Sequence, residues 1–228
     1  MLKTLFSAAV LSAMAATPLA AQDIDADAPP AQRQMSDYAT IDYNLQEDRD
    51  NILFLDLSNG QRVAIRLMPD WAPHHVERVK TLAREGFYDG VIFHRVIEGF
   101  MAQTGDPTGT GQGGSELPDL QAEFNPMPHV RGTVSMARAQ AEDSANSQFF
   151  IVFYPRFSLD KKYTNFGRVI AGMDAVDAIH RGEPPRDPTR IVQASIASDN
   201  KPAPTPQEIA ASNPASITAD DLTAPAGE

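Results

Sequence analysis

The stretch FHRVIEGFMAQTGD, residues 93–106, places His94 and Arg95 inside an apolar, β-branched run that turns at Gly99 into a second apolar segment. Such a composition is typical of β-strands. Because a strand has a side-chain period of two, Phe93 and Arg95 are predicted to share one face and His94 to lie on the other. The stretch therefore sets a guanidinium on an apolar surface, with no nucleophile, carboxylate pair or metal-ligand spacing beside it.

The strand that contains His94 and Arg95 is predicted to start at residue 90. Other segments of the chain also have the composition of strands. Asn59-Gly60 separates two of them and predicts a two-residue hairpin turn. In SQFFIVF, Gln148 and Phe150 are predicted to share a face, with Phe149 on the opposite one. The other predicted strands are 51–58, 62–68, 132–138, 147–153, 164–170 and 191–198.

Two helices interrupt the strands. Asp70 is a candidate N-cap for the first helix, which ends at Gly86, and the second is predicted over Asp174–Arg181. Six to eight strands with two helices far apart in sequence do not fit alternating βαβ units. We therefore predict a mainly β fold, a closed or nearly closed antiparallel β-barrel with a helix at each end. The first helix is predicted to bury Val76, Val79, Leu82 and Ala83.

Residues 1–21 have the parts of a secretory signal peptide: a positive charge at Lys3, an apolar region over residues 5–16, and small residues before a polar segment. Cleavage is expected near residues 20–21, although residues 13–15 also fit the small-x-small rule. A buried N-terminal helix is the alternative, which a proline and the polar run after it disfavour. No other segment is long and apolar enough to cross a bilayer. We expect a soluble protein exported to the periplasm.

The net charge of −11 is concentrated at the two ends of the chain. Residues 22–50 carry −6 and are predicted to be an acidic linker, and residues 199–228 carry −4 and are predicted to be a disordered Pro/Ala-rich tail. Residues 51–198 form the predicted folded domain. Acidic ends disfavour binding to nucleic acid and to anionic membranes. The absence of cysteine excludes disulfides, thiol nucleophiles and thiolate metal sites.

Four collinear blocks carry a resemblance to a known family. They are GFYDGVIFHRVIEGFMAQTGDPTGTGQGG (86–114), HVRGTVSMARA (129–139), SANSQFFIVF (144–153) and LDKKYTNFGRVIAGMDAVDAI (159–179). The chain resembles the cyclophilins, and within them the short exported bacterial type, over about residues 51–198. The resemblance implies a closed eight-stranded antiparallel β-barrel capped by two α-helices. It also implies peptidyl-prolyl cis-trans isomerase activity on proline-containing polypeptides, with no cofactor.

This activity explains why an arginine would lie on an apolar surface with no nucleophile beside it. Rotation about an X–Pro bond crosses a barrier of roughly 20 kcal/mol because amide resonance is lost, and no bond to carbon breaks. A donor to the lone pair that forms on the proline nitrogen, or to the substrate carbonyl, favours the twisted state. Arginine keeps its charge, and apolar walls strengthen such a contact.

The resemblance also assigns the site. Arg95 is implied to be the catalytic residue. The implied substrate-binding residues are Phe100, Met101, Phe150 and Leu159 for the proline ring and Gln103, Gln148, Ala137 and Arg138 for the peptide backbone. They also include His94, which flanks Arg95, and Tyr163, at a position where many animal members have histidine and many bacterial members tyrosine.

Three positions depart from the family pattern. Glu98 replaces a usual proline and Thr104 a usual glycine, both near the loop and outside the pocket. Ser158 stands where cyclosporin-sensitive members have tryptophan, and the single tryptophan of this chain is Trp71. We therefore expect weak cyclosporin binding.

Other interpretations of these signals remain open. Arg95 alone could pair with a carboxylate at a strand edge. Residues 109–114, GTGQGG, resemble a phosphate loop but lack its Lys-Ser/Thr ending, and the five histidines show no metal-ligand spacing. The barrel could be a chaperone or adaptor with incidental turnover, or the acidic ends could recruit a basic partner. We expect a monomer, because no long exposed apolar seam is visible in the sequence.

Overall fold

The structure, a computed structural model, describes residues 38–213. The predicted signal peptide at 1–21 lies outside the described residues, as do residues 22–37 of the predicted linker and 214–228 of the predicted tail. Within the described range, no helix combines the length and the apolar character that a membrane span requires.

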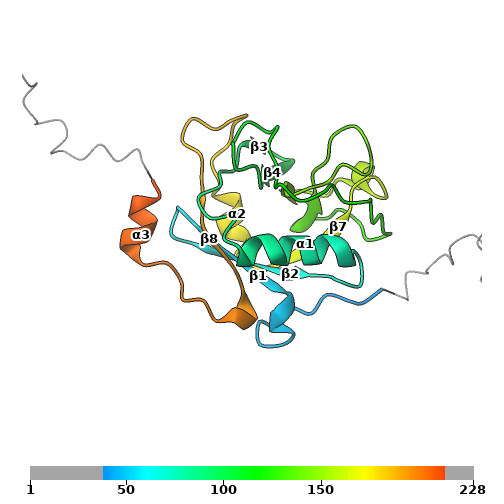
Figure 1. Cartoon of the computed structure of the whole chain (residues 1–228), viewed down its shortest axis with the longest axis horizontal. Coiled ribbons are helices and arrows are strands. Elements are labelled where there is room, and N and C mark those ends of the chain that lie inside the picture. Colours follow the sequence, from blue (N-terminus) through cyan, green and yellow to red (C-terminus); the bar gives the residue numbers. More distant parts are fainter. Residues whose placement is uncertain (1–37, 214–228) are drawn as a thin grey trace, which may run out of the picture. The chain divides into compact units, whose positions relative to one another are not determined.

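Eight strands form one sheet in which every hydrogen-bonded pair of strands is antiparallel. Their order across the sheet is β3-β4-β6-β5-β7-β2-β1-β8, so β1, β2 and β8 lie together toward one edge (Figure 1). The bounds are β1 Ile52–Leu57, β2 Arg62–Leu67, β3 Arg95–Ile97, β4 Met101–Thr104, β5 Thr133–Met136, β6 Phe149–Val152, β7 Asn165–Ala171 and β8 Ile191–Ile196.

The sheet is an open, curled half-barrel, so the expected closed barrel is wrong. β3 and β8 are its two edges. Irregular backbone hydrogen bonds join the chain before β3 to the chain before β8, for example from Phe93 N to Thr189 O at 2.9 Å. Because residues 90–94 follow this irregular path, the predicted strand becomes regular only at Arg95. The ladder between the two edges therefore does not close.

The β1–β2 hairpin forms, but its loop is one residue longer than predicted. Leu57 N donates to Gln61 O at 2.9 Å, which leaves residues 58–60 in the turn. Gly60 has a φ of +81°, in the left-handed region. A three-residue hairpin loop commonly needs glycine at that position.

The first helix, α1 Pro73–Arg84, packs along β8 and buries the predicted apolar face. Its N-cap is Ala72 rather than the predicted Asp70, and Ala72 has no capping side chain. Glu123, from a distant loop, accepts hydrogen bonds from the backbone N–H groups of His74 and His75 at 3.2 and 3.1 Å. A carboxylate there also suits the positive end of the helix dipole.

The second helix, α2 Met173–Asp177, ends four residues earlier than predicted. Beyond it, Ile179 turns into the core, and the backbone N–H of His180 donates to Thr189 Oγ1 at 3.2 Å. These contacts draw the chain out of the helix. Gly182 lies next to β3 instead of directly ending the helix.

Part of the acidic segment before the domain packs on β2. The Arg66 side chain is only 3 % exposed and donates to four backbone carbonyl oxygens at 2.7–3.1 Å. The short 3-10 helix Arg49–Asn51 follows these carbonyls. The sequence did not predict these contacts, because every residue has a backbone carbonyl group and its role as an acceptor does not depend on the side chain. The acceptor carbonyls belong to Asp42, Asn44, Glu47 and Asp48.

A third helix, α3 Pro206–Ala211, lies inside the segment predicted to be a disordered tail. A capping box begins it, in which Thr205 and Glu208 exchange hydrogen bonds. Near its end, Asn213 Nδ2 donates to Ser58 O at 3.0 Å. The Thr-Pro-Gln-Glu pattern at 205–208 is a capping signal that compositional reasoning passed over.

The two faces of the sheet carry different apolar clusters. One face forms the main core, which includes Phe149, Ile151 and Val96. The other face carries Phe150, Val152 and Met101, which form a separate small cluster. The predicted alternation along β6 is therefore confirmed. Phe93 was predicted to share a face with Arg95, but it belongs to the main core because the chain is irregular there.

Candidate active site

The register of three strands aligns a row of side chains across the second face of the sheet. Arg95 on β3 pairs with Gln103 on β4, and Gln103 pairs with Phe150 on β6. Directly paired residues of antiparallel strands point to the same side. The sheet therefore brings a guanidinium, an amide and an aromatic ring together from positions up to 55 residues apart in the sequence.

A pocket of about 240 Å³ lies at this row, and we call it the apolar pocket because six of its nine lining residues are apolar or aromatic. Its walls come from β3, β4 and β6, from the chain directly after β5, and from the 3-10 helix Phe157–Leu159 with the turn that follows it. Phe150 and Tyr163 meet edge to face, with ring centroids 5.8 Å apart. All nine lining residues are among the eleven site residues implied by sequence. They are Arg95, Phe100, Met101, Gln103, Ala137, Arg138, Phe150, Leu159 and Tyr163.

The other two residues implied by sequence lie elsewhere. Gln148 lines an adjacent cavity. His94 is buried and lines neither cavity, and a side chain at Gly111 would lie 3.6 Å from its ring. Neither ring nitrogen has a hydrogen-bond partner among the described residues. Burial lowers the pKa of His94; the charge of Asp106 opposes this shift and that of Arg95 adds to it. The position of His94 therefore offers packing against the loop rather than contact with a ligand in the pocket.

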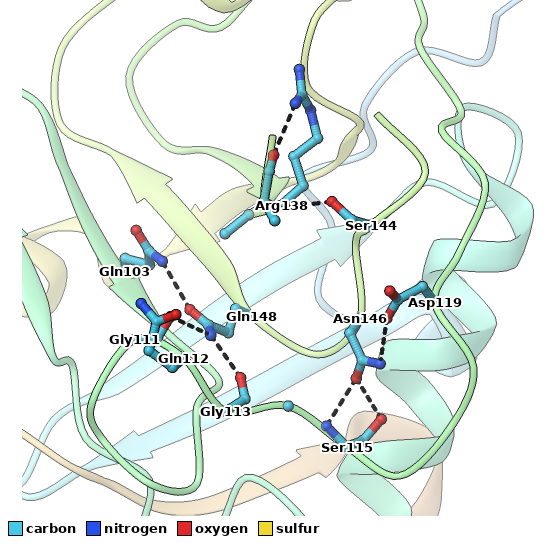
Figure 2. Close-up of a pocket in the computed structure, with 13 residues that line it drawn as sticks. Gln103, Gly111, Gln112, Gly113, Ser115, Asp119, Arg138, Ser144, Asn146 and Gln148 are labelled. Atoms are coloured by element: carbon cyan, nitrogen blue, oxygen red, sulfur yellow. Dashed lines mark hydrogen bonds between the residues drawn. The ribbon is translucent and has the colours of Figure 1, made fainter. Parts of the chain in front are cut away.

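The polar side chains of the site form a connected chain. Gln103 Nε2 donates to Gln148 Oε1 at 2.9 Å, and Gln148 Nε2 donates to the carbonyl oxygens of Gly111 and Gly113 at 3.2 and 2.7 Å (Figure 2). Arg95 Nη1 lies 3.5 Å from Gln103 Oε1. Each amide is thereby fixed in one orientation.

The glycine-rich loop at 105–114 folds around the buried carboxylate of Asp106 rather than around a bound phosphate. Asp106 accepts hydrogen bonds from the backbone N–H groups of Thr108, Gly111 and Gly113 at 2.8, 2.5 and 3.2 Å. Burial alone would raise the pKa of Asp106, but these hydrogen bonds and that of the Thr108 hydroxyl lower it. Donors that a phosphate loop would offer to a phosphate are thus used inside the protein.

A second cavity of about 480 Å³ adjoins the apolar pocket and shares Gln103, Ala137 and Arg138 with it. It is more polar, and Figure 2 shows Asn146 bonded to Ser115 on its wall. Arg138 donates to the carbonyl oxygens of residues 139, 140 and 162. The two cavities together form a site that is apolar at one end and polar at the other.

The wall of the apolar pocket rests on a buried histidine that sequence reasoning did not select. His129 stacks on Phe150, and its two ring nitrogens lie 2.8 Å from Asp160 Oδ1 and from Ser135 Oγ. Burial lowers the pKa of His129, although Asp160 acts to raise it. In the neutral ring, Nδ1–H donates to Asp160 and Nε2 accepts from the Ser135 hydroxyl. Ser135 is fully buried, so this Ser-His-Asp arrangement is structural.

The chain matches known proteins across the domain that carries this site. Residues 54–196 match the family model described as cyclophilin-type peptidyl-prolyl cis-trans isomerase/CLD. The chain belongs to the cyclophilin-type peptidyl-prolyl cis-trans isomerases. The catalysed reaction of this cyclophilin is accordingly rotation about peptidyl-prolyl bonds.

Individual relatives agree with this assignment. The cyclophilin is 49 % identical over 170 residues to a "Probable peptidyl-prolyl cis-trans isomerase" of Brucella suis biovar 1, covering 68 % of this chain and 86 % of that protein. It is 42 % identical over 128 residues to peptidyl-prolyl cis-trans isomerase B of Bacillus subtilis, covering 56 % of this chain and 89 % of that one.

Solved structures share the fold. Cyclophilin AquaCyp293 of Hirschia baltica superposes with a TM-score of 0.63 at 31 % identity, covering 68 % of this chain and 77 % of that chain. A cyclophilin-type isomerase of Cryptosporidium parvum, crystallised in the presence of the dipeptide Ala-Pro, superposes with a TM-score of 0.59 at 29 % identity. That match covers 64 % of this chain and 98 % of that chain.

Proposed function

We propose that this cyclophilin accelerates X–Pro rotation by non-covalent stabilisation of the twisted amide through Arg95. The observation that carries the proposal is that the Arg95 guanidinium lies on the wall of the apolar pocket beside Phe100, Met101 and Phe150. Such a pocket suits a proline ring, and the arginine supplies the donor that the twisted amide needs.

The proposed chemistry needs no covalent intermediate. As the amide twists, the proline nitrogen becomes pyramidal and its lone pair becomes a hydrogen-bond acceptor. A donor held in place at a site of developing charge is worth about 10²–10³-fold in rate. An arginine guanidinium offers N–H donors and no acceptor, so this side chain can only donate to the amide.

The remaining residues of the site are proposed to bind the substrate. Phe100, Met101, Phe150 and Leu159 would hold the proline ring by apolar contact. Gln103, Ala137 and Arg138 border both cavities, Gln148 borders the larger one, and all four would contact the peptide backbone. The relative from Cryptosporidium parvum was crystallised in the presence of the dipeptide Ala-Pro. This supports a proline-containing peptide as the ligand of the present site.

We also propose that the enzyme acts on exported proteins in the periplasm. The support is the sequence of residues 1–21, with its positive charge, apolar region and small residues. Cell fractionation and the N-terminal sequence of the mature chain test this. Recovery of the full-length chain from the cytoplasm would contradict it. The proposed monomeric state is tested by sedimentation of the mature protein.

The proposed mechanism is tested by the cis-to-trans rate of an Ala-Pro-type peptide with wild type and with Arg95→Ala. The expected loss in kcat/KM is about 10²-fold or more, which corresponds to about 2.7 kcal/mol. Arg181→Ala is the matched control, because Arg181 also forms an ion pair but does not line the pocket. If wild type bound the peptide yet hardly exceeded the uncatalysed rate, the chaperone or adaptor interpretation would replace this one.

A further inference from the structure

The arginine on the pocket wall is held by a carboxylate from a distant part of the chain. Arg95 Nε donates to Glu183 Oε2 at 2.8 Å. Glu183 lies in the loop between α2 and β8, 88 residues further along the chain. The two side chains are 41 % and 53 % exposed, so the pair lies at the solvent border of the site.

The backbone fixes this loop against β3. Val96 N donates to Gly182 O at 2.8 Å, and Gly182 N donates to Val96 O at 2.9 Å. In this antiparallel bridge the next residues to face each other are Arg95 and Glu183. Gly182 has a φ of +146°, and a Cβ there would lie 2.6 Å from Pro185 Cα. Only glycine fits this position, so the loop that carries Glu183 is built to lie beside the strand that carries Arg95.

The ion pair with Glu183 leaves the protons on the Nη nitrogens of Arg95 available. A guanidinium carries five N–H groups in one plane. Glu183 takes the proton on Nε, and Gln103 Oε1 lies 3.5 Å from Nη1. The other arginine that lines the pocket, Arg138, instead donates to main-chain carbonyl oxygens. The carboxylate therefore restrains the plane of the Arg95 guanidinium, and within residues 38–213 only Gln103 is hydrogen-bonded to an Nη group, so most Nη protons are available to a substrate.

We infer that Glu183 is a positioning residue for Arg95, which holds the guanidinium in the orientation that stabilises the twisted amide without itself touching the substrate. This inference rests on the proposed function, in which Arg95 acts on the amide. Displacement of a catalytic group by about 1 Å can cost about 10²-fold in rate. Loss of one restraint, with Gln103 still in place, is expected to lower kcat by about three- to tenfold.

The experiment measures kcat and KM separately for an Ala-Pro-type peptide. Glu183→Ala is expected to lower kcat about three- to tenfold with KM changed by less than about twofold. Glu183→Gln keeps a carbonyl acceptor for Nε–H and is expected to lie between Glu183→Ala and wild type. Glu98→Gln is the matched control, because Glu98 accepts from Arg181 Nε at 2.7 Å in the same geometry outside the pocket. Its kcat is expected to equal that of wild type.

A double-mutant cycle separates positioning from a structural role. In the Arg95→Ala background, Glu183→Ala is expected to cause no further loss. The inference is overturned if Glu183→Ala retains the wild-type kcat, or if it causes the same loss with and without Arg95. If Arg95→Ala itself keeps full activity, both the proposed mechanism and this inference fail. If Arg95→Ala is inactive and Glu183→Ala is normal, only this inference fails.

Discussion

His129 stacks on Phe150, with ring centroids 6.4 Å apart and planes 20° from parallel. The aromatic wall of the apolar pocket is therefore backed by an imidazole, which Asp160 and Ser135 hold from its two ends. The pocket that is proposed to receive the proline ring is therefore supported by residues that do not line it.

His129→Leu is expected to impair both folding and substrate binding. It leaves the buried Ser135 hydroxyl without its partner and removes one of the two hydrogen bonds that residue 129 gives to Asp160 Oδ1, the backbone one remaining. This is expected to cost about 1–3 kcal/mol in the free energy of unfolding. It also removes the stacked support of Phe150, so KM should rise more than kcat falls. Denaturant unfolding and steady-state kinetics measure the two effects. His180→Leu is the control, since the His180 side chain is 57 % exposed; equal effects of the two variants would contradict this account.

The free energy of unfolding is expected to decrease as the pH falls below about 6.5. Burial lowers the pKa values of His94 and His129 in the folded state. At pH values between the ordinary histidine pKa and these lowered pKa values, the unfolded chain binds protons that the folded chain does not. Acid therefore favours unfolding. Urea unfolding at about pH 5 and about pH 8 measures the difference. A His129→Leu variant should show a weaker pH dependence, and equal stability of wild type at both pH values would rule out this role of the histidines.

Glu123→Gln is expected to lower the free energy of unfolding by about 1–2 kcal/mol, because Glu123 caps α1 from a distance. Burial would raise the pKa of Glu123, but hydrogen bonds from His75 and His74 lower it to about 2. Its contribution is therefore present above about pH 4.5 and is lost as the pH falls toward 2. Glu77→Gln, on the exposed side of the same helix, is the control. Thermal unfolding at neutral pH that did not distinguish the two variants would contradict the capping role.

The strand patterns and the family resemblance predicted much of this structure because they depend on side chains along single segments. The alternation in SQFFIVF predicted that Phe149 and Phe150 lie on opposite faces of the sheet, as observed. The family resemblance, not the alternation, implied Phe150 as a residue of the proline pocket. What the sequence did not predict depends on backbone atoms or on contacts between distant segments. The prediction of a closed barrel was wrong because residues 90–94 leave the regular strand ladder. The contacts of Arg66 were not predicted because its partners are main-chain carbonyl oxygens.

The same limit applies within the site. The family blocks pointed to all nine residues that line the apolar pocket. They did not point to His129 or Glu183, which reach the site through Phe150 and Arg95. The sequence does show a glycine directly before Glu183, which is typical of a tight backbone approach. Only the bridge from Gly182 to Val96 on β3 reveals that this approach places Glu183 beside Arg95.

Ser158→Trp is expected to tighten cyclosporin binding by about tenfold or more, from a weak wild-type affinity. Ser158 is exposed beside Leu159 at the pocket, and the resemblance assigns tryptophan to this position in cyclosporin-sensitive cyclophilins. A tryptophan there would add aromatic contact area and an N–H donor. Titration calorimetry of both proteins measures the change. Phe157→Trp, at the neighbouring position whose side chain is 63 % exposed, is the control; nanomolar binding by wild type would contradict the prediction.

The most direct test of the central claim measures binding and bond rotation in the same sample. Cis–trans exchange of a saturating Ala-Pro-type peptide is followed by NMR with wild type and Arg95→Ala. The account predicts that the variant still binds the peptide within about threefold of wild type, because the apolar pocket remains, while exchange in the complex slows by about 10²-fold or more. Exchange at the wild-type rate in the bound variant would show that Arg95 is not the catalytic group.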